Sequence, residues 1–153
     1  MTTYNSSVVI NRPIEEVFDT ATCLRSCVNW QTSMVRAEKD ATGPAEVGAK
    51  YNHEVKFMGL NIEAHPVIRA IEAPRRFVFG DDTTFIPYEV TYSFDPVEGG
   101  TRFTARIESG SGGPALIKGI ARSVFEKPFN RQVQSDMEAL KDLMEAGATV
   151  KIP

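Results

Sequence analysis

The feature that most constrains the fold is a regular alternation of apolar and polar residues through the middle of the chain. It covers residues 51–57 and recurs over 88–94 and 103–107. A period of two residues is typical of β-strands with one buried face. The connections are short, and Gly99-Gly100 marks a hairpin turn. Because parallel neighbours would need long crossovers, these strands are expected to form an antiparallel meander.

The period changes toward the C-terminus. From residue 116 to 146 the apolar residues recur at helical spacing, and Gly147 is a natural helix end. Pro128 is expected to kink this helix or split it near Lys127, because proline lacks an amide donor. Runs of strands followed by a helix favour an α+β domain in which the helix covers one sheet face.

The N-terminal segment predicts a strand over 8–10 and then two short helices. Pro13 followed by two glutamates is typical of a helix start. A second short helix is expected over about 22–29. The whole chain, residues 1–153, therefore predicts a single α+β domain with an antiparallel sheet of about seven strands and one long C-terminal helix.

Charge and composition narrow the function classes. A net charge of −3 argues against a nucleic-acid partner, because binding to phosphates usually needs a basic excess. The apolar stretches are too short for a membrane span, and the first residues lack the pattern of a signal peptide, so a cytoplasmic location is expected. A chain of this length buries roughly 70% of its unfolded surface, enough for a core and a cavity. The oligomeric state is left open, with a homodimer as one option.

Cysteine and histidine are the residue types most often found at metal or redox sites, and the chain has two of each. Cys23 and Cys27 lie four residues apart on one face of the expected helix, which is poor geometry for a disulfide. Two reduced thiols are the simpler interpretation, and a redox pair or a zinc site is the alternative. No cofactor and no metal site are predicted.

Several motifs resemble a known superfamily. The N-terminal residues that carry the resemblance are Val8, Ile10, Pro13, Val17, Phe18, Asp19 and Trp30. They resemble the start of the START-like (SRPBCC) superfamily, in particular its polyketide cyclase/dehydrase-type single domains, which are relatives of the birch-pollen allergen. Residues 72–77 and 100–103 are similar to the mid-chain turn and late hairpin of these proteins. The resemblance implies a helix-grip fold, in which a curved antiparallel sheet wraps around the long C-terminal helix and leaves a cavity between them.

The fold alone does not name a reaction, so three candidate functions are considered. The first is the binding of a hydrophobic small molecule, aromatic or lipid-like, between sheet and helix. The second is a cofactor-free cyclase or dehydratase that uses a histidine and a tyrosine of the cavity as an acid–base pair. The third is a protein-interaction module without any ligand.

The phase of the strands selects the candidate ligand contacts. Large apolar side chains on the inner face would either line a cavity or fill the core themselves. The candidate ligand-binding residues are Trp30, Val55, Phe57, Phe77, Phe79, Tyr92, Phe103, Ile107, Phe125 and Phe129.

His53 is the main catalytic candidate because it shares the apolar phase of its strand. A histidine in a pocket can move a proton or orient a carbonyl, with Tyr51 or Tyr88 as its partner. The alternative is a structural histidine that is hydrogen-bonded to a neighbouring tyrosine. On the C-terminal helix, Asp136 belongs to a charged face that is expected to meet solvent.

Overall fold

The described elements start with a strand and finish with a long helix. The computed structural model describes residues 2–39, 45–57, 59–84, 87–110 and 122–147, and only the backbone of residues 2, 39, 57 and 122–125. The elements are β1 (Thr2–Ile10), α1 (Ile14–Ala21), the 3₁₀ turn η1 (Cys27–Asn29), β2 (Met34–Lys39), β3 (Tyr51–Phe57), β4 (Leu60–Ala64), β5 (Val67–Glu72), β6 (Arg76–Asp81), β7 (Tyr88–Val97), β8 (Gly100–Ser109) and α3 (Arg122–Glu145).

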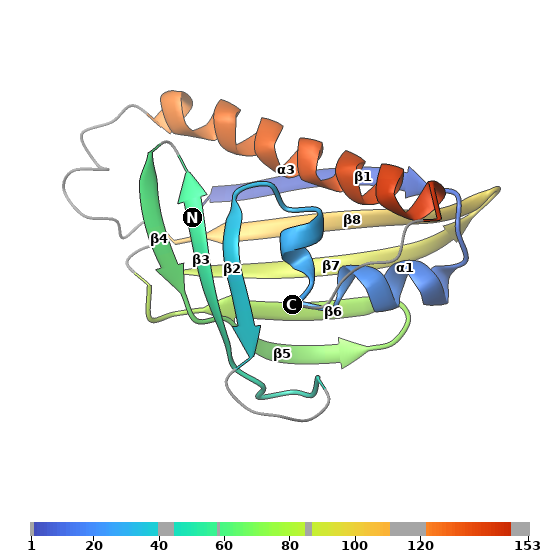
Figure 1. Ribbon diagram of the computed structural model, residues 1–153, viewed down its shortest axis with the longest axis horizontal. Helices are drawn as coiled ribbons and strands as arrows, with labels where there is room; N and C mark the ends of the chain where they lie inside the picture. The colour runs from blue at the N-terminus through green and yellow to red at the C-terminus, as the bar shows by residue number, and fades with distance from the viewer. Residues whose placement is uncertain (1, 40–44, 58, 85–86, 111–121, 148–153) are drawn as a thin grey trace.

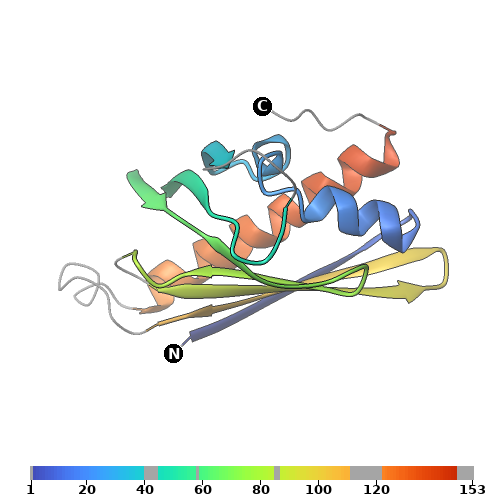
Figure 2. The same cartoon turned by 90° about the horizontal axis from the view of Figure 1, so that it is seen from below.

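The strands form two antiparallel sheets. The larger has the order β1-β8-β7-β6-β5, and the smaller has the order β2-β3-β4, with strands that run across those of the larger sheet (Figure 1). Helices α1 and α3 lie on the same side of the larger sheet (Figure 2). The expected α+β helix-grip architecture is confirmed, with eight strands in the described residues rather than about seven. None of the described helices has the length and hydropathy of a membrane span.

The division into two sheets was not expected. After an expected turn at residues 58–60, the sequence predicts one strand that runs to about Glu72, whereas the structure breaks it at His65 and Pro66. Pro66 has no amide hydrogen to donate to a strand ladder, and its carbonyl accepts from the Tyr51 N–H at 3.0 Å. The strand β2 is a further addition that the alternation of residues does not predict. The chain therefore changes sheets at Pro66.

The second short helix is much shorter than expected. Only the 3₁₀ turn η1 forms, with the Trp30 N–H donating to the Cys27 carbonyl at 3.1 Å. Side chains compete for the local backbone carbonyls. The Ser26 hydroxyl donates to the Cys23 carbonyl at 3.0 Å, and the Asn29 amide donates to the Ser26 carbonyl at 2.9 Å. Such local bonds favour turns over a regular helix.

Helix α3 continues through Pro128 without a break, so the expected split is wrong. Proline removes one backbone hydrogen bond, and the helix packs against β1. The Lys141 ammonium donates to the Val9 carbonyl at 2.9 Å, and the Asn11 N–H donates to a Glu145 carboxylate oxygen at 3.0 Å. Gly147, with φ of +72°, lies just beyond the end of the helix as predicted.

Aromatic packing fills one end of the space between the sheet and the helices. Phe103 on β8 pairs in register with Phe94 on β7, and their rings stack at 5.0 Å. Phe18 of α1 packs on Phe94 at 5.1 Å and on Phe77 at 6.4 Å. Helix α1 therefore closes this end, and the other end is left for a cavity.

Candidate functional site

A cavity of about 260 Å³ lies between the larger sheet, helix α3 and the smaller sheet. Its wall is mostly apolar and draws on all these elements and on the segment around η1. The lining residues are Tyr4, Leu24, Trp30, Gln31, Ser33, Met34, His53, Val55, Ile62, Ala64, Phe79, Thr84, Tyr88, Val90, Tyr92, Phe103, Ala105, Ile107, Ser109, Phe129, Gln132, Val133, Asp136 and Met137.

The structure brings most of the predicted site residues to this wall. They are Trp30, His53, Val55, Phe79, Tyr88, Tyr92, Phe103, Ile107 and Phe129. Tyr51 and Phe77 are instead buried in the core and do not line the cavity. The side chains of Phe57 and Phe125 lie outside the described residues.

Sequence reasoning identified Phe129 on helix α3 but missed Val133 and Met137 on the same helix, as well as the residues that follow Trp30. Phe129, Val133 and Met137 are spaced four residues apart, which places them on one helix face. That spacing was a usable signal. Ser33 and Met34 follow an irregular turn, and no periodicity identifies such residues.

His53 on β3 is almost completely buried, with an exposed fraction of 4%. Its ring bonds to the backbone of Leu24, and among the described residues no tyrosine takes the place that the structural alternative gave it. Nε2 has no hydrogen-bond partner in the part of the chain that the structure describes. Burial lowers the pKa of His53 from 6.5 to about 4, and the backbone bond offsets this only in part. The ring is therefore neutral at pH 7.

Trp30 follows η1 and faces the same cavity. Its side chain is 3% exposed, and its ring packs edge-on against Phe103 at 6.4 Å. Its Nε1 has no hydrogen-bond partner among the described residues. Of the buried side-chain nitrogen and oxygen atoms there, only His53 Nε2 shares this property. Buried polar atoms are normally hydrogen-bonded, so this pair is an exception within one cavity wall.

Asp136 is buried rather than solvent-facing, which corrects the expectation for the charged helix face. Its Oδ1 accepts from the Thr32 N–H and hydroxyl, both at 3.1 Å, and from the Gln132 amide at 2.8 Å. These bonds tie the turn after Trp30 to helix α3. Burial nevertheless raises the pKa of Asp136.

Two tyrosines add hydroxyl groups to the wall. The Tyr92 hydroxyl is hydrogen-bonded by the Gln31 side chain, and burial raises the pKa of this phenol. Burial also raises the pKa of Tyr88, which lines the cavity near Asp81. Both phenols therefore stay protonated at neutral pH and can act as hydrogen-bonding groups.

The sequence matches a family model described as "Polyketide cyclase / dehydrase and lipid transport" over residues 1–145. The chain belongs to this polyketide cyclase/dehydrase and lipid transport family. The match covers both sheets and helix α3, and therefore the whole cavity wall. No curated protein matches the sequence.

Solved structures share the fold of this polyketide cyclase/dehydrase family member at low sequence identity. The TTHA0849 protein of Thermus thermophilus is 19% identical, with a TM-score of 0.82 over 97% of this chain and 100% of that one. DR_A0006 of Deinococcus radiodurans is 16% identical, with a TM-score of 0.70 over 96% and 99%. Ara h 8.0201 is 11% identical, with a TM-score of 0.71 over 95% and 98%. These similarities support the fold.

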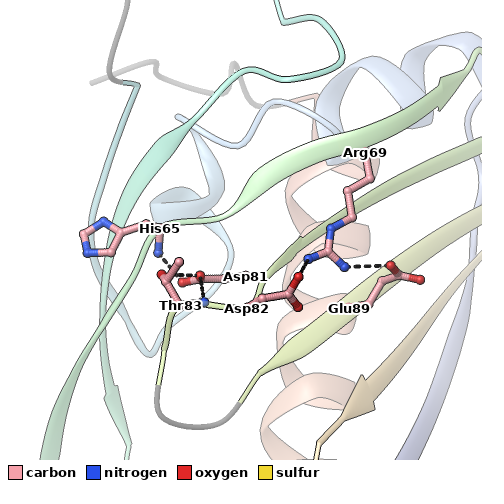
Figure 3. A network of polar contacts seen from close by, with 6 residues as sticks. All are labelled: His65, Arg69, Asp81, Asp82, Thr83 and Glu89. Carbon is pink, nitrogen blue, oxygen red and sulfur yellow. Dashed lines mark hydrogen bonds and ion pairs between the residues drawn. The ribbon is translucent and has the colours of Figure 1, made fainter.

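In this polyketide cyclase/dehydrase family member, the buried carboxylate of Asp81 ties the backbone of His65 to the residue Thr83 that follows β6 (Figure 3). Asp81, at the end of β6, accepts from the His65 N–H at 2.7 Å. It also accepts from the Thr83 N–H at 2.7 Å and the Thr83 hydroxyl at 2.5 Å. These bonds lower the pKa of Asp81, although burial alone would raise it. The next residue, Thr84, lines the cavity.

Replacing Asp81 with asparagine is expected to lower the free energy of unfolding by about 1–3 kcal/mol, because the new amide donor would face a backbone donor. Asp82→Asn is the matched control. The Asp82 side chain is largely exposed and pairs with Arg69 at 3.0 Å, so its loss is expected to cost less than about 0.5 kcal/mol. Urea unfolding of both variants measures the difference, and equal effects would contradict the role of Asp81.

Proposed function

We propose that this protein binds a hydrophobic small molecule in the cavity between the sheet and helix α3. The observation that carries the proposal is the cavity of about 260 Å³ with its mostly apolar wall. Concave apolar sites with a few polar groups are the usual form of small-molecule sites. Membership of a family described in part by lipid transport supports the same function.

An acid–base enzyme is the second candidate, and the electrostatics of the site favour it less. A general base works best with a pKa near the working pH, whereas the pKa of His53 is about 4. Tyr51 does not line the cavity, and the raised pKa of Tyr88 makes its phenol a weak acid. Both groups are better suited to hydrogen bonding than to proton transfer. A ligand-free interaction module would have no use for the cavity.

Fluorescence titration with N-phenyl-1-naphthylamine, an uncharged apolar probe, tests the binding function. We expect saturable binding with increased probe emission. Ala105→Leu adds three carbons at the cavity wall and is expected to weaken probe binding at least about tenfold by occupying the space. Thr104→Leu lies next to it on β8, whose alternate residues face opposite sides of the sheet, and is the matched control.

The control is expected to bind the probe as the unchanged protein does. Circular dichroism of both leucine variants establishes that each remains folded. Probe binding that survives Ala105→Leu unchanged would place the probe elsewhere, and the absence of saturable binding in the unchanged protein would contradict the proposed function.

A further inference from the structure

We propose that the cavity selects an uncharged aromatic ligand that carries a hydroxyl group, with Trp30 and His53 as the residues that recognise it. This inference rests on the proposed function and specifies its ligand class. Trp30 Nε1 and His53 Nε2 are the two buried side-chain atoms that lack a hydrogen-bond partner in the described residues, and both belong to side chains of this one wall.

The protonation state of His53 determines whether the ligand must donate or accept a hydrogen bond at Nε2. Since Nε2 has no partner, the bond to the Leu24 backbone is made by Nδ1. A carbonyl oxygen only accepts, so Nδ1 carries the proton of the neutral ring. Nε2 therefore presents a lone pair to the cavity wall, and a ligand must donate to it.

Trp30 requires a ligand group that accepts a hydrogen bond. An indole nitrogen donates and cannot accept. The pair at the wall therefore consists of one acceptor and one donor. A hydroxyl group is both a donor and an acceptor, so it can bond to either nitrogen, whereas an ether oxygen can bond only to Trp30 and a methyl group to neither.

The other polar side chains of the wall disfavour an anionic ligand. Among the described lining residues there is one carboxylate, Asp136, and neither a lysine nor an arginine. A ligand carboxylate would lose its hydration without gaining a cation, which is costly in an apolar site. An uncharged ligand avoids that cost.

The size of the cavity restricts the ligand further. Ligand sites commonly range from roughly 300 to 1,000 Å³, and about 260 Å³ lies just below that range. The rings of Phe79, Phe103 and Phe129 border this space, and aromatic ligands pack well against such edges and faces. Two fused rings fit this volume better than a long acyl chain or a sterol.

The test compares 2-naphthol with 2-methylnaphthalene, which has nearly the same shape but no hydroxyl. Trp30 is the only tryptophan of the sequence, so its indole N–H gives one identifiable NMR signal. We expect 2-naphthol to move this signal downfield as the hydrogen bond forms, and to shift the Nε2 resonance of His53. 2-Methylnaphthalene is expected to bind without these changes, and 2-naphthoate to bind more weakly than either.

Calorimetric titration of variants provides the second readout. Trp30→Phe and His53→Phe each remove the polar atom and keep an aromatic ring. In each, the affinity for 2-naphthol is expected to fall by roughly 3- to 10-fold relative to the affinity for 2-methylnaphthalene. His65→Phe changes an exposed histidine outside the cavity and is expected to leave the ratio unchanged.

The outcomes separate the two proposals. If both naphthalenes bind, but the indole and Nε2 signals respond alike to each and the variants leave the affinity ratio unchanged, the hydroxyl preference is wrong and the binding function stands. If neither compound binds the unchanged protein, the proposed function itself fails. The NMR comparison uses the unchanged protein, so it decides the question even if a variant does not fold.

Discussion

Replacing Phe103 with alanine is expected to lower the free energy of unfolding by about 3–5 kcal/mol, the usual cost of removing a fully buried aromatic ring. Phe103 is 0% exposed. Its ring stacks on Phe94 at 5.0 Å and meets the ring of Tyr92 edge-on at 4.9 Å. For a domain of this size the loss corresponds to a fall of roughly 10 °C in Tm, which calorimetry can measure.

The Phe94→Ala variant is the matched control for Phe103→Ala. Phe94 is also fully buried and belongs to the same stack, but it does not line the cavity. Both variants are expected to lose similar stability. Only Phe103→Ala enlarges the cavity, so 2-methylnaphthalene is expected to restore more stability to this variant than to Phe94→Ala. A loss below about 1 kcal/mol for Phe103→Ala would contradict the packing described for β8.

Acidification from pH 6.5 to about 4 is expected to remove roughly 3 kcal/mol of stability through His53 alone. Its pKa is 6.5 in an unfolded chain and about 4 in the folded protein, and this difference sets the magnitude. Within that window the unfolded state binds more protons than the folded state. The free energy of unfolding therefore falls as the pH falls. The stability associated with a neutral His53 is fully present only above pH 6.5.

His53→Gln removes the titrating group and is expected to flatten this part of the pH profile, while His65→Gln is expected to keep it. Urea unfolding at several pH values measures the three profiles. Asp81 and Asp136, whose pKa values are lowered and raised respectively, are present in all three proteins, so their effects cancel in the comparison. Identical profiles for the unchanged protein and His53→Gln would refute the burial of a neutral His53.

Local patterns predicted the parts of this fold that depend on local chemistry. The alternation over 88–94 and 103–107 predicted β7 and β8, and Gly99, with φ of +83°, lies at their turn. A two-residue period determines which side chains share a sheet face, so it also predicted that His53 points inward. The long C-terminal helix and its end at Gly147 followed from spacing and glycine chemistry in the same way.

Features that depend on distant partners could not be predicted. Asp136 belongs to a charged helix face by sequence, yet Thr32 covers it with two hydrogen bonds from a turn 104 residues earlier. The change of sheet at Pro66 likewise depends on Tyr51, which donates to the Pro66 carbonyl, and on Asp81, which accepts from the His65 N–H. Helical or strand periodicity contains no information about such partners.

The sequence by itself determined the secondary structure that follows from side-chain period, the antiparallel pairing that short turns require, and the family to which the chain belongs. The tertiary structure alone decided that a cavity remains between sheet and helix, because its volume depends on how rings from separate elements pack. It also decided that Trp30 and His53 reach the same wall with nitrogen atoms that have no partner among the described residues. Whether a buried polar atom has a partner depends on three-dimensional distances, which residue spacing does not determine.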